Sequence, residues 1–318
     1  MSARSQTGAV RRLARRVKPV GYWFSPDGTR IAFTRLRESV NGDFRLDAEV
    51  WIMNGDGSQA TRLTYNSTDD LGATWSPDGK TIAFYGNQYV PDGRGGLVVM
   101  PPPHVFLIDV ESGAQTALTA GRFPSWSQDG HRIAFDSSGA ASKLFVINVD
   151  GTGVELIANQ PPARNIRPDW SPNGRQIAFA SGPNGTEQIY VMNADGSDLK
   201  PLTSGNAPDW SPNGRQILFQ STRDGNSEIY VMDADGSNQM RLTFYAGNDL
   251  DADWSPDGRS ISFEREREGP LDPTLQQVFV LDLHTPGAEP VPLTFPPSEN
   301  GHPGWARGRA VKPNLPRD

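Results

Sequence analysis

Aspartates at alternate positions before a repeated Trp-Ser-Pro phrase are the residues of this chain best suited to bind a cation. Asp249, Asp251 and Asp253 precede Trp254 at odd intervals. Equivalent positions before the other copies are also polar, and they hold Asp70, Asn165, Arg167, Asp169, Asp209, Asn300 and His302. If these residues line one channel, carboxylates about 8 Å apart repel by roughly 2 kcal/mol at an effective dielectric near 20. A bound cation should therefore reduce the repulsion between these carboxylates.

Three cations could do so: Ca²⁺, which accepts carboxylate and amide oxygens, a basic peptide, or the chain's own arginine-rich N-terminus. The calcium site would use Asp249, Asp251 and Asp253. A plainer interpretation stays open beside it, in which each aspartate caps a turn or accepts backbone N–H groups at the channel mouth.

A second group of candidates lies in long segments between expected strands. Residues 34–49, 85–104 and 264–277 are long, whereas the corresponding segments of the other three copies are short. Long loops on one side of a fold favour a binding role over tolerated insertion, and Tyr and Arg are preferred at binding hot spots. The predicted binding rim consists of Arg35, Arg37, Arg45, Tyr85, Tyr89, Arg94, His104 and Arg265.

Catalytic chemistry has weaker support in the sequence. The chain has no cysteine, which excludes thiolate nucleophiles and cysteine-ligated metal sites, and it has no Gly-x-Ser-x-Gly nucleophile motif. If the chain is an enzyme, His104 and His302 would serve as acid and base with Tyr85 or Glu264. That alternative is a cofactor-free lyase or cyclase, and we expect no cofactor other than Ca²⁺.

The elements that position these residues come from an internal repeat. An aromatic residue followed by Ser and Pro, or by Ser and Gln in one copy, begins at positions 24, 75, 126, 170, 210 and 254. An Ile follows each leading aromatic after seven residues and a Phe after nine. Short runs rich in β-branched and aromatic residues between turn signals indicate β-strands, and Ser-Pro-Asp-Gly suits a type I turn between two of them.

Four antiparallel strands per copy, repeated six times, predict an all-β fold of radially arranged sheets. We expect a six-bladed β-propeller of four-stranded antiparallel blades. The alternative has seven blades, with a partial blade built from Trp305 and both termini.

The repeat Trp-Ser-Pro-Asp-Gly-x-x-Ile-Ala-Phe, followed by Ile-Tyr-Val-Met-Asn-Ala-Asp-Gly-Ser and Leu-Thr, resembles the WD-like propeller repeat of the TolB family. The resemblance covers about residues 22–305. It implies a protein-interaction propeller, because most family members are of this kind. TolB itself is a periplasmic component of the envelope-spanning Tol–Pal system.

Charge and hydropathy suggest the partner and the location. The net charge is −7, and because residues 1–18 hold six basic residues and no acid, the remainder carries −7 − 6 = −13. An acidic body disfavours nucleic acid as the main partner. We expect a protein or basic peptide as partner, with a small molecule as a second option. No apolar run is long enough to span a membrane.

We expect a basic N-terminal arm at residues 1–20 and a single propeller domain at residues 21–318. Without a recognisable signal peptide we expect a cytoplasmic protein. A periplasmic or secreted protein whose leader was removed is the alternative.

Overall fold

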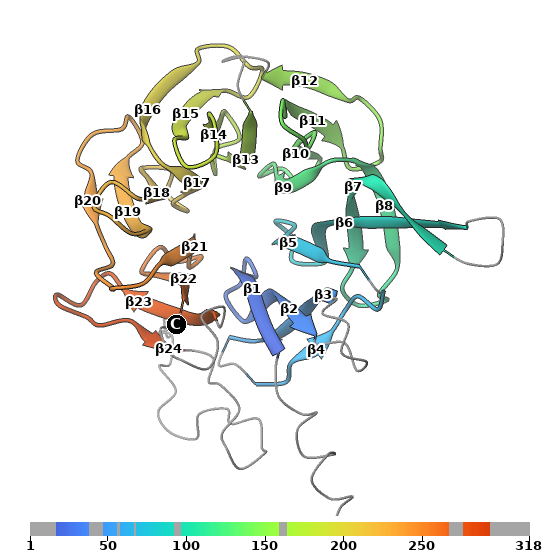
Figure 1. Cartoon of the computed structure of the whole chain (residues 1–318), viewed down its shortest axis with the longest axis horizontal. Coiled ribbons are helices and arrows are strands. Elements are labelled where there is room, and N and C mark those ends of the chain that lie inside the picture. Colours follow the sequence, from blue (N-terminus) through green and yellow to red (C-terminus); the bar gives the residue numbers. More distant parts are fainter. Residues whose placement is uncertain are drawn as a thin grey trace, which may run out of the picture.

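The computed structural model describes residues 17–37, 47–55, 58–66, 68–91, 97–158, 164–266 and 276–292. They form 24 strands in six four-stranded antiparallel sheets, which are arranged as blades around a common axis (Figure 1). The predicted six-bladed propeller is confirmed. Trp305, on which the seven-bladed alternative depended, lies outside the described residues.

Each blade uses four consecutive strands, and the first strand of each lies nearest the axis (Figure 1). Blade 1 contains β1 (Val17–Phe24), β2 (Arg30–Arg37), β3 (Asp47–Asn54) and β4 (Thr61–Arg62). Blade 2 contains β5 (Asp70–Trp75), β6 (Thr81–Pro91), β7 (Leu97–Asp109) and β8 (Gln115–Ala120). Blade 3 contains β9 (Arg122–Trp126), β10 (Arg132–Asp136), β11 (Leu144–Asn148) and β12 (Glu155–Ala158).

The second half of the chain follows the same order. Blade 4 contains β13 (Asn165–Trp170), β14 (Gln176–Ser181), β15 (Gln188–Asn193) and β16 (Lys200–Ser204). Blade 5 contains β17 (Asn206–Trp210), β18 (Gln216–Ser221), β19 (Glu228–Asp233) and β20 (Met240–Arg241). Blade 6 contains β21 (Asp249–Trp254), β22 (Ser260–Glu266), β23 (Gln276–Asp282) and β24 (Val291–Pro292). Because β1 begins at Val17, the first blade starts inside the expected N-terminal arm.

The Ser-Pro-Asp-Gly turn joins the first two strands of a blade, as the sequence predicts. In blade 1 the Gly28 N–H donates to the Ser25 carbonyl (2.7 Å), and Gly28 has a φ of +68°. The Asp27 carboxylate accepts from the Ser25 hydroxyl (2.6 Å) and from the Thr29 N–H (3.0 Å). The pKa of Asp27 is lowered, and these two hydrogen bonds are the largest causes. The aspartates of these turns are therefore occupied by the turn itself.

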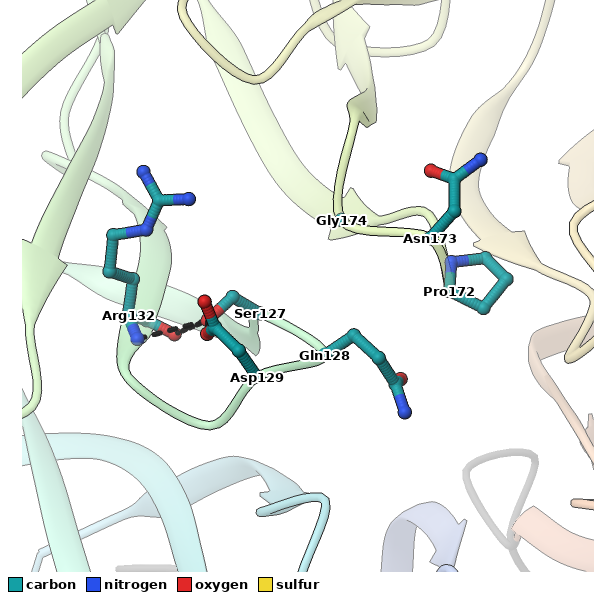
Figure 2. A pocket seen from close by; sticks show the side chains of 7 residues that line it. All are labelled: Ser127, Gln128, Asp129, Arg132, Pro172, Asn173 and Gly174. Atoms are coloured by element: carbon teal, nitrogen blue, oxygen red, sulfur yellow. Dashed lines mark hydrogen bonds between the residues drawn. The ribbon is translucent and has the colours of Figure 1, made fainter.

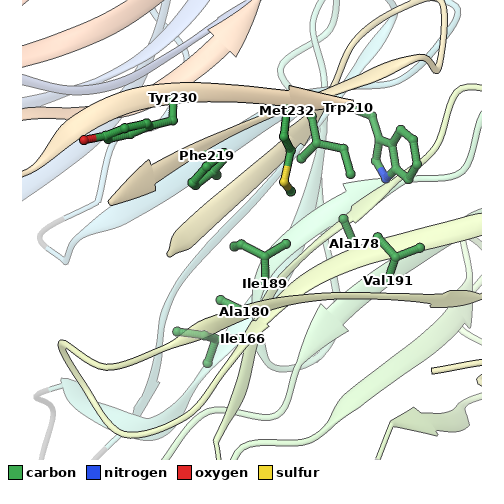
Figure 3. Packing of buried hydrophobic residues seen from close by; sticks show 10 residues of the cluster. Ile166, Ala178, Ala180, Ile189, Val191, Trp210, Phe219, Tyr230 and Met232 are labelled. Carbon is green, nitrogen blue, oxygen red and sulfur yellow. The ribbon is translucent and has the colours of Figure 1, made fainter. Parts of the chain in front are cut away.

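The apolar core lies between neighbouring blades and not at the axis. At the boundary of blades 4 and 5, Ile189 and Val191 pack against Trp210, Phe219 and Met232 (Figure 3). Burying one such side chain contributes about 1.5–3 kcal/mol. A similar cluster joins Ile31, Phe33 and Met53 of blade 1 to Val278 of blade 6, so apolar packing also closes the ring.

Every innermost strand contains a β-bulge close to its middle. In β21, Asp249 pairs with Arg265 and Asp253 pairs with Ser262, so the intervals span four residues on one strand and three on the other. In blades 3 to 6 the bulge residue is not a glycine and yet has a positive φ. These residues are Phe123 (49°), Arg167 (52°), Ala207 (49°) and Asp251 (45°). Such a backbone conformation costs about 1–3 kcal/mol in a non-glycine residue and is concentrated at functional sites.

Candidate binding site in the hub

The hub is the part of the propeller formed by β1, β5, β9, β13, β17 and β21. In blades 4 to 6 the residue before the leading tryptophan is an aspartate whose carboxylate binds the next blade. Asp169 accepts from the Trp210 N–H (2.8 Å), and Asp209 accepts from the Trp254 N–H (2.9 Å). Asp253 accepts from the Phe24 N–H (3.4 Å), which joins the last blade to the first. The three aspartates thus accept backbone N–H groups, as the plainer interpretation predicts.

These three carboxylates are electrostatically unfavourable. Burial raises the pKa of Asp169 to about 6. Burial also raises the pKa of Asp209 well above its usual range, and the charges of Asp253 and Asp169 raise it further. The pKa of Asp253 is raised by burial first and by the charge of Asp169 second. All three are half-buried, so solvent or a ligand can still reach them.

The other half of the hub joins its blades with uncharged groups, and one of these contacts, that of Ser125, is equivalent to the aspartate contacts. The Ser125 hydroxyl accepts from the Trp170 N–H (3.1 Å). Between blades 1 and 2 the Trp75 indole donates to the Trp23 carbonyl (3.0 Å), and between blades 2 and 3 the Trp126 indole donates to the Thr74 carbonyl (3.2 Å). We call blades 1 to 3 the neutral half of the hub and blades 4 to 6 the acidic half. The comparison shows that joining two blades does not require a carboxylate.

A cross-blade ion pair is formed by residues two positions before Asp169 on β13 and Asp253 on β21. Arg167 of blade 4 binds Asp251 of blade 6, and the side chains are 30% and 28% exposed. The Arg167 guanidinium also stacks 4.8 Å from the ring centre of Phe123. Tyr85 packs against the same ring with a centroid distance of 4.9 Å, and burial raises the pKa of Tyr85 to about 12. The hub therefore holds a guanidinium between an aromatic ring and a carboxylate.

Phe123 was not among the residues expected at this site. It occupies the same repeat position as Arg167 and Asp251, three residues before the leading tryptophan. The sequence argument considered only polar residues there, although the repeat itself placed Phe123 in the set.

Three predicted channel residues are buried elsewhere. Asp70 and Asn165 are 1% exposed and Asp249 is fully buried. The prediction assumed unbroken alternation along the strand, but the bulge inserts one residue and turns the side chains before it to the opposite face. Asp249 instead accepts two hydrogen bonds from Arg265, at 2.7 and 2.8 Å.

The predicted calcium ligands consequently have three different partners. Asp249 binds Arg265, Asp251 binds Arg167, and Asp253 accepts from Phe24. Over the described part of the chain, no group of three or more His, Cys, Asp or Glu side chains could hold a metal ion. Asn300 and His302, the remaining predicted residues of the hub, lie outside the described residues.

The predicted rim divides into residues with different surroundings. Arg35 and Arg37 lie on β2, where they pair in register with Glu49 and Asp47. Arg265 is directed to Asp249 because the two residues are paired across β21 and β22. Of the other predicted rim residues, Arg45 and Arg94 lie outside the described residues.

The expected long loop at residues 85–104 is largely an extended hairpin. Strand β6 continues to Pro91 and β7 starts at Leu97, and this hairpin projects beyond the wheel (Figure 1). Tyr89 pairs with Val99 within it. The outer part of the hairpin therefore extends away from the hub (Figure 1), whereas Tyr85 at its base contacts Phe123.

The residues proposed for acid–base catalysis have separate environments. His104 places Nδ1 3.0 Å from the Pro102 carbonyl, and its ring lies near Phe106. Glu264 is 1% exposed, and burial raises its pKa well above the usual range. No described contact joins His104, Tyr85 and Glu264 to one another, and His302 lies outside the described residues.

A surface pocket of about 310 Å³ lies between the first turns of blades 3 and 4 (Figure 2). Its polar groups already belong to a turn, because the Ser127 hydroxyl donates to Asp129 (2.6 Å) and accepts from the Arg132 N–H (2.9 Å). Pro172 and Asn173 of the next turn form the other wall. The pocket follows from two adjacent copies of the repeat turn.

Comparison with known proteins identifies the family of the chain. The profile described as the TolB beta propeller domain matches residues 99–206 and 203–310, which together span more than half of the chain. The chain belongs to the TolB β-propeller domain family. The TolB-like repeat seen in the sequence is thereby confirmed, and no helix in the described ranges is long and apolar enough to cross a membrane.

Individual relatives of this TolB-like propeller match only in part. It is 30% identical over 196 residues to an uncharacterized protein of Agrobacterium fabrum. The aligned region covers 56% of this chain and 59% of that protein. It is also 30% identical over 166 residues to a TolB homolog of Chlorobium luteolum. That aligned region covers 52% of this chain and 34% of the homolog. The chain thus spans less than two thirds of the length of these relatives.

A solved structure agrees at the level of the fold. TolB from Acinetobacter baumannii superimposes with a TM-score of 0.64 at 21% identity, over 80% of this chain and 61% of that one.

Proposed function

We propose that this protein is a non-catalytic interaction propeller whose acidic half-hub binds a positively charged segment of a partner protein or peptide. The supporting observation is the difference between the two halves of the hub. Asp169, Asp209 and Asp253 accept a backbone N–H of the next blade, and in blade 3 the neutral Ser125 hydroxyl makes the same bond. Since their charges repel one another, a cationic ligand would stabilise all three.

The ion pair of Arg167 and Asp251 bears on how such a ligand is held. Arg167 stacks on Phe123 and binds Asp251, which is the arrangement that a guanidinium favours in a partly buried site. Because the Phe123 ring already carries Arg167 and Arg122, an arginine of the partner would instead be neutralised by the three hub carboxylates. The acidic body of the protein would accelerate the encounter at low salt.

A labelled hexa-arginine peptide tests this proposal in solution, with a hexa-glutamate peptide as the control. We expect fluorescence anisotropy to report binding of the basic peptide only, and we expect the affinity to fall as salt is added. Equal binding of both peptides, or binding of neither, contradicts the proposal.

Family membership bears on location as well. We infer that the protein acts in the periplasm, the alternative to the cytoplasmic location expected from the sequence, because the family resemblance implies an envelope system. Fractionation of cells expressing the full-length native gene product measures this, and recovery of the protein only with cytoplasmic markers contradicts it.

A further inference from the structure

The turns that join the first two strands of each blade form a ring of contacts. Each of these repeat turns ends in a glycine, and in five of the six copies its second residue is a proline. A Cβ atom built on the glycine would lie 3.2–4.0 Å from the proline ring of the preceding blade's turn in five of the six pairs. In these pairs a pyrrolidine ring therefore occupies the place above the glycine. They are Pro26–Gly79, Pro77–Gly130, Pro172–Gly214, Pro212–Gly258 and Pro256–Gly28.

The sixth pair, between blades 3 and 4, has Gln128 in place of the proline. A Cβ atom built on Gly174 would have no atom of the described residues within 4 Å. The surface pocket of about 310 Å³ lies at this pair, and both Gln128 and Gly174 line it (Figure 2). The pocket is thus located where the ring of proline–glycine contacts is interrupted.

The backbone of the turn is the same with and without the proline. The Gly130 N–H donates to the Ser127 carbonyl (2.9 Å), just as the Gly79 N–H donates to the Ser76 carbonyl (2.9 Å). The two glycines have φ values of +70° and +68°. The open place above the next glycine therefore results from the side chain at position 128 and not from a displaced turn.

An arginine at the wall of the pocket offers hydrogen-bond donors. Its guanidinium, that of Arg132, lies 5.1 Å from the centre of the Trp170 ring. The corresponding Arg30 of blade 1 stacks on Trp75 (4.7 Å) and also donates to the Gly79 carbonyl (3.0 Å). Among the described residues, the Arg132 guanidinium makes the stacking contact but no hydrogen bond. Its N–H groups can therefore donate to an acceptor in the pocket.

The charges at the pocket favour a neutral ligand. Asp129 and Arg132 carry opposite charges and both line it. The Asp129 carboxylate accepts from the Ser127 hydroxyl (2.6 Å) and from the His131 N–H (3.0 Å) of its own turn. Since the two charges balance, an uncharged group with an acceptor oxygen suits the site better than a free ion.

We propose that this pocket binds a proline-containing segment of a partner protein, with the proline ring over Gly174 and a neighbouring backbone carbonyl accepting from Arg132. The chain itself shows that both groups fit. A proline ring occupies the corresponding place in the other five pairs, and a backbone carbonyl is the group that Arg30 binds.

The size of the pocket and the stiffness of proline agree with such a ligand. A volume of about 310 Å³ is at the lower end of the usual range for ligand sites, about 300–1,000 Å³, which suits a short segment. Proline restrains its own backbone, so a proline-containing segment loses little conformational freedom when it binds. This second site does not depend on the proposed binding of a basic segment at the hub.

The test is a ¹H–¹⁵N NMR titration of the full-length protein with the capped, uncharged peptide Ala-Pro-Ala-Pro-Ala, at concentrations up to about 10 mM. Capped penta-alanine is the control peptide. We expect the signals of the Gly174 amide and the Arg132 Nε–H group to shift progressively with the proline peptide only. Signals that do not move, or that move equally with both peptides, overturn the proposal.

Gln128→Pro should close the site, because it restores the ring that fills the other five pairs. We expect this variant to lose the peptide-induced shifts and to melt at the same temperature as the wild type or slightly above it, since proline suits the second position of a type I turn. Gln128→Ala is the matched control, which leaves the place open and should bind like the wild type. Equal loss of binding in both variants overturns the proposal.

Arg132→Gln tests the second half of the site and should weaken binding of the proline peptide about tenfold. The hub variant D169N/D209N/D253N should bind this peptide like the wild type. Loss of binding in the hub variant but not in Arg132→Gln would assign the peptide to the hub and overturn the proposal. Because the peptide is uncharged, failure of the hexa-arginine experiment would leave this result unaffected.

Discussion

The two halves of the hub perform the same mechanical task by different chemistry. In the acidic half, carboxylates of Asp169, Asp209 and Asp253 accept the backbone N–H of the next blade. In the neutral half, the Ser125 hydroxyl accepts a backbone N–H, and two backbone carbonyls accept the indole N–H groups of Trp75 and Trp126. Both halves bury similar apolar clusters between blades, so the ring does not need the charges to close. The difference indicates that the acidic half carries a task beyond closure, which we assign to binding a cationic segment.

We expect the largest effect when a fourth carboxylate is introduced into the hub. Ser125→Asp places a charge beside Asp169, whose carboxylate now accepts from the Ser125 hydroxyl (3.1 Å). We expect the free energy of unfolding in urea to fall by about 2–3 kcal/mol, because a bond is lost and a repulsion is added. Ser125→Asn is the control of similar size. An equal loss in both variants would attribute the effect to packing instead of charge.

The pH dependence of stability should come from the acidic half. The folded pKa of Asp169, about 6, lies above the ordinary value of 3.8, so its neutral form is favoured by folding. Its contribution to stability is present below pH 4 and is lost as the pH rises through about 6. We expect a loss on the order of 1 kcal/mol after allowing for partial exposure, measured by urea unfolding across this range. Asp169→Asn should remove this part of the slope, and an unchanged slope would contradict the assignment.

Relief of repulsion should have a smaller effect with the opposite sign. Asp209→Asn keeps an acceptor for the Trp254 N–H and removes one charge from the cluster, so stability should rise by about 1 kcal/mol at neutral pH. Asp209→Ala removes the acceptor too and should be destabilising. Equal destabilisation by both substitutions would mean that the carboxylate is a purely structural acceptor.

Calcium should have the smallest effect. Because Asp249, Asp251 and Asp253 have three different partners, we expect addition or chelation of Ca²⁺ to leave the melting temperature unchanged. A calcium-dependent rise that is abolished by Asp251→Asn would restore the metal site predicted from the sequence.

The sequence predicts the fold well because its signals are local and repeated. Six leading aromatics, each followed by Ile and Phe at fixed intervals, correspond to six blades. The turn phrase forms the expected turns for the same reason, since Pro and Gly fix its backbone.

The site was predicted less well because it depends on one irregular residue per strand. No residue type marks the bulge, which is formed by Phe123 in one blade and by Asp251 in another, and it reverses the side on which Asp70 and Asp249 lie. The partners of Arg167 and Arg265 come from register and ring closure, which a single sequence does not contain. The repeat therefore located the acidic positions, while only the structure shows which carboxylates share the hub.

The central claim is tested most directly by measuring how tightly a labelled hexa-arginine peptide binds to the wild type and to the triple variant D169N/D209N/D253N. The variant D78N/D129N/D195N, which removes three carboxylates of surface turns, is the matched control. The account predicts a loss of affinity of at least about tenfold, equivalent to about 1.4 kcal/mol, in the triple variant and little change in the control. Equal affinity for the wild type and a correctly folded triple variant would contradict it.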